Sequence, residues 1–92
     1  MVKYEIKPSN QFKKDLKLAA KRGYNIDLLS DVIKKLANGE TLSPKHRDHQ
    51  LSGNFGIYRE CHITPDWLLI YQINDNELIL HLTRTGTHSD LF

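Results

Sequence analysis

The chain has 92 residues, 26% charged and 39% hydrophobic, which is the composition of one globular domain spanning residues 1–92 with a single modest core. Its lone cysteine excludes an internal disulfide, and no run approaches the roughly 18 apolar residues of a membrane span. The first residues, MVKYEIKPSN, lack the apolar region of a signal peptide. We therefore expect a cytoplasmic protein without membrane contact. The net charge of +2 is unevenly spread: residues 1–50 carry eleven Lys and Arg against six Asp and Glu, whereas residues 51–92 carry two against five.

A short strand and two helices are predicted first. Residues 2–7 alternate apolar and polar side chains, which indicates a strand. Ser9 or Asn10 can cap a following helix, which Gly23 ends in the C′ position. A second helix with one apolar face begins at about Ile26. The two helices are expected to form a hairpin that lies on one sheet.

Cations line one face of the first predicted helix, where Lys13, Lys17 and Lys21 recur every four residues. The polar loop that follows the second helix adds Lys45 and Arg47. The N-terminal half could therefore attract a polyanion. A solvated basic helix surface is the alternative, and charge alone favours it.

Three strands are predicted in the C-terminal half, at residues 55–63, 67–73 and 78–84. Turns at residues 64–65 and 74–76 separate them. The middle strand is apolar enough to be central. The order β-α-α-β-β-β indicates an α+β domain in which a helical hairpin packs on a largely antiparallel sheet.

Polar side chains are expected to gather at one end of this three-stranded meander. Because consecutive strands run up, down and up, His62, Asp66 and Arg84 reach the same end. A three-residue first turn would place His62 directly opposite Asp66, and a three-residue second turn would place Asp66 opposite Arg84. Each residue also has an ordinary alternative, as a surface cation, a turn residue or a strand histidine, and Trp67 is expected in the core.

The C-terminal tail begins at the same end of the sheet. A turn at Gly86 would let His88 return to this edge with Phe92 beside it. The loop that precedes the meander could bring His49 to the rim, although topology leaves open which end it reaches. The convergence of these groups favours a functional cluster.

Several imidazoles, a carboxylate and a guanidinium together suit RNA cleavage. Histidine, with a pKa of about 6.5, can take the proton of the ribose 2′-OH and supply one to the 5′-oxygen leaving group. Arginine matches phosphate oxygens as a bidentate donor. No metal is required for this chemistry, and the pair His46 and His49 lacks the further ligands of a typical zinc site. Cys61 alternates with His62 and therefore points to the other face of the strand.

The segments DHQLSGNFGIYRECHITPDWLLIY and RTGTHSDLF resemble the YafQ branch of the RelE/ParE toxin superfamily. The order of the predicted elements fits the RelE-like fold over essentially the whole chain. The resemblance implies the toxin of a toxin–antitoxin pair. It also implies a metal-independent endoribonuclease without a cofactor, which cuts mRNA in the ribosomal decoding site and is inhibited by a cognate antitoxin.

The resemblance also implies roles for single residues. His88 is the expected general acid, Arg84 stabilises the charged phosphorane, and Phe92 supports a nucleobase. His49 is the preferred base for the 2′-OH, with His62 and Asp66 as its rivals or supports. The side chains expected to face ribosomal RNA are Lys13, Lys17, Lys21, Lys45 and Arg47.

Two other classes of function fit the same fold. A ParE-like toxin would inhibit DNA gyrase without cutting RNA, and it would need neither the imidazoles nor the tail. A non-catalytic RNA- or protein-binding module is the third possibility. Replacing His88 separates these classes, because nuclease activity should depend on it and gyrase inhibition should not.

Overall fold

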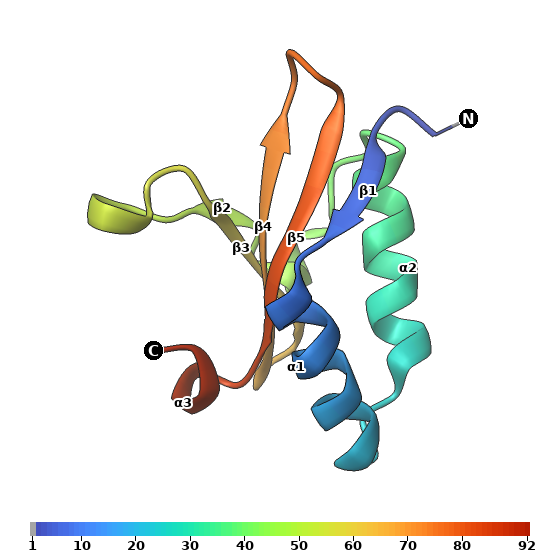
Figure 1. Ribbon diagram of the computed structural model, residues 1–92, viewed down its shortest axis with the longest axis vertical. Coiled ribbons are helices and arrows are strands. Elements are labelled where there is room, and N and C mark those ends of the chain that lie inside the picture. The colour runs from blue at the N-terminus through green and yellow to red at the C-terminus, as the bar shows by residue number, and fades with distance from the viewer. Residues whose placement is uncertain (1) are drawn as a thin grey trace.

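Five strands form one mixed sheet in the order β1-β5-β4-β3-β2 (Figure 1). The structure is a computed structural model that describes residues 2–92 of the predicted domain, so Met1 lies outside the described residues. Strands β3, β4 and β5 form the predicted antiparallel meander, and β1 pairs with β5 in parallel. The α+β prediction is therefore confirmed. The elements are β1 (Glu5–Pro8), α1 (Asn10–Lys21), α2 (Ile26–Ala37), β2 (His49–Gln50), β3 (Arg59–Thr64), β4 (Trp67–Asn74), β5 (Ile79–Gly86) and α3 (His88–Leu91), with single 3-10 turns η1 (Pro44–His46) and η2 (Gly53–Phe55).

Helices α1 and α2 begin and end where the sequence indicates. The Ser9 side chain accepts the Phe12 amide at the start of α1, and Asn25 accepts the Asp27 amide at the start of α2. Gly23 follows α1 with a φ of +80°, a left-handed conformation that favours glycine. Both helices cover the same face of the sheet (Figure 1). Their apolar sides meet the sheet in one core, which includes Phe12, Leu29, Val32, Leu36, Leu69, Tyr71 and Leu80.

The structure corrects the predicted strand at residues 55–63, because β3 begins only at Arg59. Gly53, with a φ of +63°, starts the 3-10 turn η2, and the chain turns there before it enters the sheet. The expected strand at residues 2–7 likewise starts late, at Glu5, since the amides of the two preceding residues bind the carbonyl of Ala37 on α2. Short strand β2 was not predicted.

The turns of the meander also differ from the prediction. Thr64 pairs with Trp67 across a two-residue turn, and a bulge before it pairs His62 with Leu68 rather than with Asp66. Arg84 pairs with Ile70, so the predicted pairing of Asp66 with Arg84 is wrong as well. Proline is favoured at the first central position of a tight turn, which explains why Pro65-Asp66 forms the turn alone.

Candidate active site on the open face of the sheet

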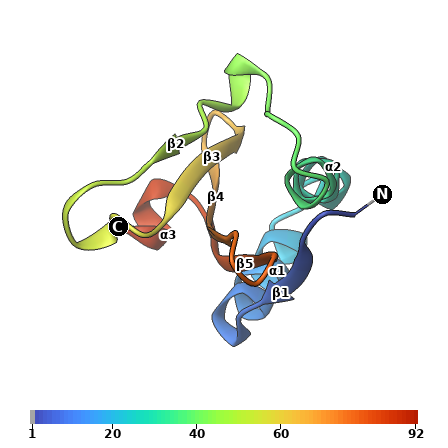
Figure 2. The ribbon, with the colours of Figure 1, turned by 90° about the horizontal axis from the view of Figure 1, so that it is seen from above.

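The imidazole side chains meet on the sheet face opposite α1 and α2. Helix α3 returns to this face after β5, and the C-terminus ends beside the loop that joins β2 to β3 (Figures 1 and 2). The ring centroids of His62 and His88 are 6.1 Å apart, and those of His88 and Phe92 are 6.0 Å apart. Phe92 also meets Phe55 of η2 edge-to-face at 5.9 Å. The structure thus brings β3 and the tail together, as the sequence analysis expected, and adds Phe55 of η2, which was expected in a strand.

A buried carboxylate lies between two of these histidines. One oxygen of Glu60, Oε1, is 3.6 Å from Nε2 of His49 and 3.6 Å from Nε2 of His62. The cause is the sheet register: His49 pairs with Glu60 across β2 and β3, and residues two apart on a strand share a face. Glu60 was missed from the sequence, although its position two residues before His62 was a usable signal.

The other ring nitrogens of these histidines face backbone carbonyls. Nδ1 of His49 is 2.7 Å from the carbonyl oxygen of Arg47, and Nδ1 of His62 is 3.3 Å from that of Pro65. A histidine that donates Nδ1–H to a carbonyl keeps Nε2 as the nitrogen that exchanges protons. In both rings the exchangeable nitrogen is therefore the one beside Glu60.

The predicted turns required Asp66 to lie between His62 and Arg84, and it does not lie there. It is exposed in the two-residue turn, where it lines a recess with Tyr24 and His88. The predicted site residue that shares a recess with Asp66 is therefore the tail histidine, His88.

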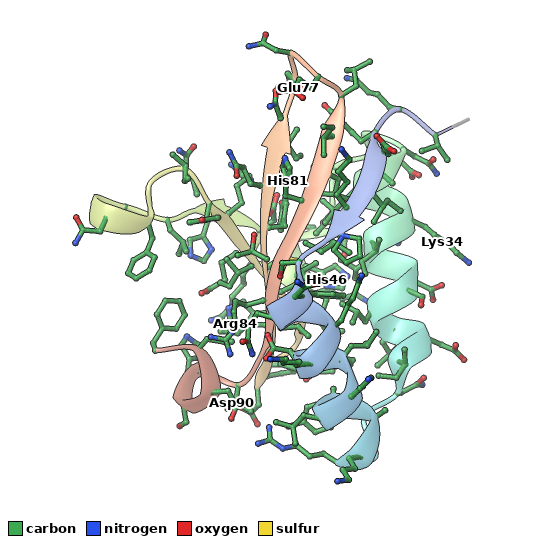
Figure 3. The ribbon with its side chains drawn as sticks, viewed as in Figure 1. Lys34, His46, Glu77, His81, Arg84 and Asp90 are labelled. Atoms are coloured by element: carbon green, nitrogen blue, oxygen red, sulfur yellow. The ribbon has the colours of Figure 1, made fainter. Side chains whose placement is uncertain are left out.

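Arg84 is held by a carboxylate that the sequence analysis did not select. Its Nε donates to Oδ2 of Asp15 on α1 at 2.8 Å, and its Nη2 donates to Oδ1 at 3.2 Å. Figure 3 shows Arg84 on β5, beside α1 and above α3. The hydrogen bonds with Asp15 raise the pKa of Arg84 above its usual value, although burial opposes this. Burial alone would raise the pKa of Asp15, but hydrogen bonds from Arg84, Gln11 and the Thr85 amide outweigh it and lower that pKa.

The tail itself is tied to the body of the protein by an ion pair. Asp90 accepts hydrogen bonds from Arg22 at 2.6 and 3.2 Å, and it closes a capping box with Thr87 at the start of α3. A Cβ added to Gly86 would lie 3.0 Å from the Asp90 side chain, so any larger residue would push this carboxylate from its place. These contacts hold the backbone that carries His88 against α1.

The predicted RNA-facing cations fall into two groups. Lys45 and Arg47 line a recess with His62, at the edge of the imidazole cluster. The lysines of α1 are exposed on its outer side, about 120–160° around the helix from Asp15. Only the loop cations therefore border the site, and Lys13, Lys17 and Lys21 lie on a separate surface.

Three further side chains are buried and take no part in the cluster on the open face. Trp67 is 3% exposed and donates Nε1–H to the Thr85 hydroxyl at 2.8 Å. His46 is buried with Nδ1 2.7 Å from the His62 carbonyl oxygen, so it supports β3. Cys61 is fully buried, and burial raises the pKa of its thiol to about 12. Within residues 2–92, no group of three or more His, Cys, Asp or Glu side chains is arranged to hold a metal ion, and no helix is long and apolar enough to cross a membrane.

The two ion-paired carboxylates predict how stability depends on pH. Hydrogen bonds from Arg22 and from the Thr87 amide hold the pKa of Asp90 well below its usual range, and that of Asp15 is lowered as well. A depressed folded-state pKa stabilises the protein fully above the unfolded value of about 3.9, and this stability is lost as the pH falls toward the folded-state pKa. We therefore expect the melting temperature to fall as the pH drops below about 4. Thermal unfolding followed by circular dichroism between pH 2 and 7 measures this. Asp90→Asn should reduce the fall of the melting temperature at acid pH, whereas Asp31→Asn, on the exposed surface of α2, should not. An equal fall in the wild type and both variants would contradict a stabilising role of the Asp90 ion pair.

Comparison with known proteins gives a consistent result. A family model described as the bacterial toxin of type II toxin-antitoxin systems, YafQ, matches residues 4–92. The mRNA interferase toxin YafQ of Escherichia coli K12 is 40% identical over 93 aligned residues, which cover 100% of this chain and 99% of that protein. The Escherichia coli DinJ-YafQ toxin-antitoxin complex is similar at 39% identity over 99% of each chain, with a TM-score of 0.90. A metal-bound toxin from Helicobacter pylori is similar at 46% identity over 100% of each chain, with a TM-score of 0.91.

Proposed function

Because this chain belongs to the YafQ family of toxins from type II toxin–antitoxin systems, we propose that it is an endoribonuclease that cuts mRNA, inhibited by a cognate antitoxin. The observation that supports this best is the position of His62, His88 and Phe92 on one open sheet face, where the centroids of neighbouring rings are about 6 Å apart. Two imidazoles can act as acid and base on one phosphodiester only if both can reach it, and His62 and His88 lie on the same face. Arg84 borders this face, where it lines a recess with Phe92.

We assign the acid step to His88, which protonates the 5′-oxygen as it leaves. His88 is exposed at the start of α3, where RNA can reach it. Asp66, beside it in the recess, supports this histidine. The products are a 2′,3′-cyclic phosphate and a 5′-hydroxyl, because the attacking nucleophile is the neighbouring 2′-OH.

We assign proton abstraction from the 2′-OH to His49, with Glu60 shared between it and His62. The carboxylate lies beside both imidazoles and can form an ion pair with the imidazolium that results when His49 takes the proton. Arg84 binds the phosphate as negative charge accumulates, and Phe92 supports a nucleobase. Each step is carried by a side chain, so the proposed reaction is metal-independent and needs no cofactor.

The proposal includes the ribosome as the place of cleavage, and hence the cytoplasm. The site is an open face rather than an enclosed cleft, which suits an enzyme whose substrate is positioned by another body. Cations on two surfaces, the loop with Lys45 and Arg47 and the outer side of α1, can contact ribosomal RNA. This part of the proposal predicts weak activity on free RNA.

The test is cleavage of a defined mRNA, free or programmed into purified ribosomes, with cut sites mapped by primer extension. We expect cuts in the decoding site on ribosomes and at least about tenfold slower cleavage of free mRNA. Toxin treated with a chelator and then freed of it by gel filtration should cut at the same rate as untreated toxin. A rate restored only by added copper or zinc would overturn metal independence, and no cleavage on or off ribosomes would overturn the nuclease; a gyrase supercoiling assay on the same protein tests the ParE-like alternative.

A further inference from the structure

The carboxylate of Asp15 is more fully engaged than an ordinary surface ion pair requires. Asp15 is 8% exposed. Its Oδ2 accepts Nε–H of Arg84 at 2.8 Å and the Thr85 amide at 3.2 Å, and its Oδ1 accepts Nη2–H of Arg84 at 3.2 Å and Nε2–H of Gln11 at 3.1 Å. Each carboxylate oxygen therefore accepts from two donors, and together they fix the orientation of the carboxylate.

This arrangement leaves one particular edge of Arg84 free for a ligand. A guanidinium offers two bidentate edges, one formed by Nε and Nη2 and the other by Nη1 and Nη2. Asp15 occupies the first edge, so the second edge is left without a contact to this carboxylate. Arg84 also lines two recesses, one shared with Asp15 and Gln11 and the other shared with Ile70 and Phe92. The guanidinium thus stands in the wall between the helix and the open face.

We propose that Asp15 is a positioning residue for the nuclease reaction: it fixes the plane of Arg84 so that the Nη1–Nη2 edge meets the scissile phosphate. This inference rests on the proposed function. Arg84 carries no free long-range charge in the pair, because the carboxylate neutralises it. The contribution of Arg84 to catalysis therefore depends on the direction in which its N–H groups point. The stabilisation is larger for the charged phosphorane than for the ground-state phosphate.

Asp15→Asn tests the proposal with little change in shape. The amide nitrogen of asparagine is a donor, and whichever way the amide turns it faces donors from Arg84 and from either Gln11 or the Thr85 backbone. The guanidinium is then released from its plane. We expect kcat for cleavage on programmed ribosomes to fall roughly 10- to 100-fold, with KM nearly unchanged. Asp31→Asn is the matched control, since it removes the same charge from an exposed site on α2, and it should cut like the wild type.

A double-mutant cycle separates positioning from a merely structural role. In an Arg84→Ala background, Asp15→Asn should change kcat by less than about twofold, because the side chain through which Asp15 acts is gone. An equal loss of kcat in both backgrounds, or an unchanged kcat in the single variant, would overturn the proposal.

Hydrogen exchange at the Arg84 side chain gives a second readout that needs neither ribosome nor RNA. In the wild type, the Nε–H of Arg84 should exchange with solvent at least about tenfold more slowly than that of exposed Arg47, because it is bonded to Asp15. Equal rates for the two arginines overturn the positioning role even if Asp15→Asn does not fold. A wild type that cuts no mRNA but protects Nε–H overturns the nuclease instead, so the two failures can be told apart.

Discussion

Replacing His88 with alanine is expected to reduce mRNA cleavage on ribosomes by about 100-fold or more, which is what loss of a general acid costs. The imidazole is exposed and projects from α3 toward the cluster, 6.1 Å from the His62 ring. Alanine is a good helix former, so α3 and its capping box should persist. The measurement is the single-turnover rate on programmed ribosomes, together with the melting temperature of each protein.

His81→Ala is the matched control for His88→Ala. His81 lies on β5, the strand that leads into the tail, and pairs with Gln72 at the far end of the sheet from α3 (Figure 3). The control should keep the wild-type rate. If His88→Ala folds and cuts as fast as His81→Ala, then the tail histidine is not the acid and His62 becomes the candidate for that role.

Replacing Trp67 with alanine is expected to lower the free energy of unfolding by about 3–5 kcal/mol. The indole is buried, packs against the tilted Tyr24 ring at 5.1 Å between ring centroids and donates a hydrogen bond to Thr85. A domain of this size has only about 0.05–0.15 kcal/mol of stability per residue, so the loss is a large share of the total. We expect the melting temperature to fall by about 12 °C or more, measured by circular dichroism.

Trp67→Phe distinguishes a core role from a catalytic one. Phenylalanine keeps an aromatic ring against Tyr24 and loses the indole N–H and part of the ring volume, while the Thr85 hydroxyl still donates to the Leu68 carbonyl. This variant should be much more stable than Trp67→Ala and should cut mRNA at close to the wild-type rate. A fully stable Trp67→Ala protein that cannot cut RNA would show that the indole contacts the substrate.

The elements and the general location of the site could be predicted from local patterns. Both main helices have cap residues and a helical apolar period, and the meander has turn residues between apolar runs. The tail helix α3 also had a signal, since Thr87 and Asp90 are spaced as a capping box. Strand polarity then brought His62, Arg84 and the tail to one end of the sheet without any knowledge of register.

What the sequence by itself determined is the order of the two main helices and of the meander strands, and the end of the sheet at which His62, Arg84 and the tail gather, because these follow from residue period and strand direction. Only the tertiary structure decided which carboxylates act as partners. Asp66 is close to His62 along the chain yet lies in the turn, whereas Asp15 meets Arg84 across 69 positions. A bulge or a two-residue turn changes every cross-strand pair, and packing of α1 on β5 sets the long-range contact. Neither is encoded in a local period, which is why the contacts of Asp15 with Arg84 and of Glu60 with His49 emerge only from the folded chain.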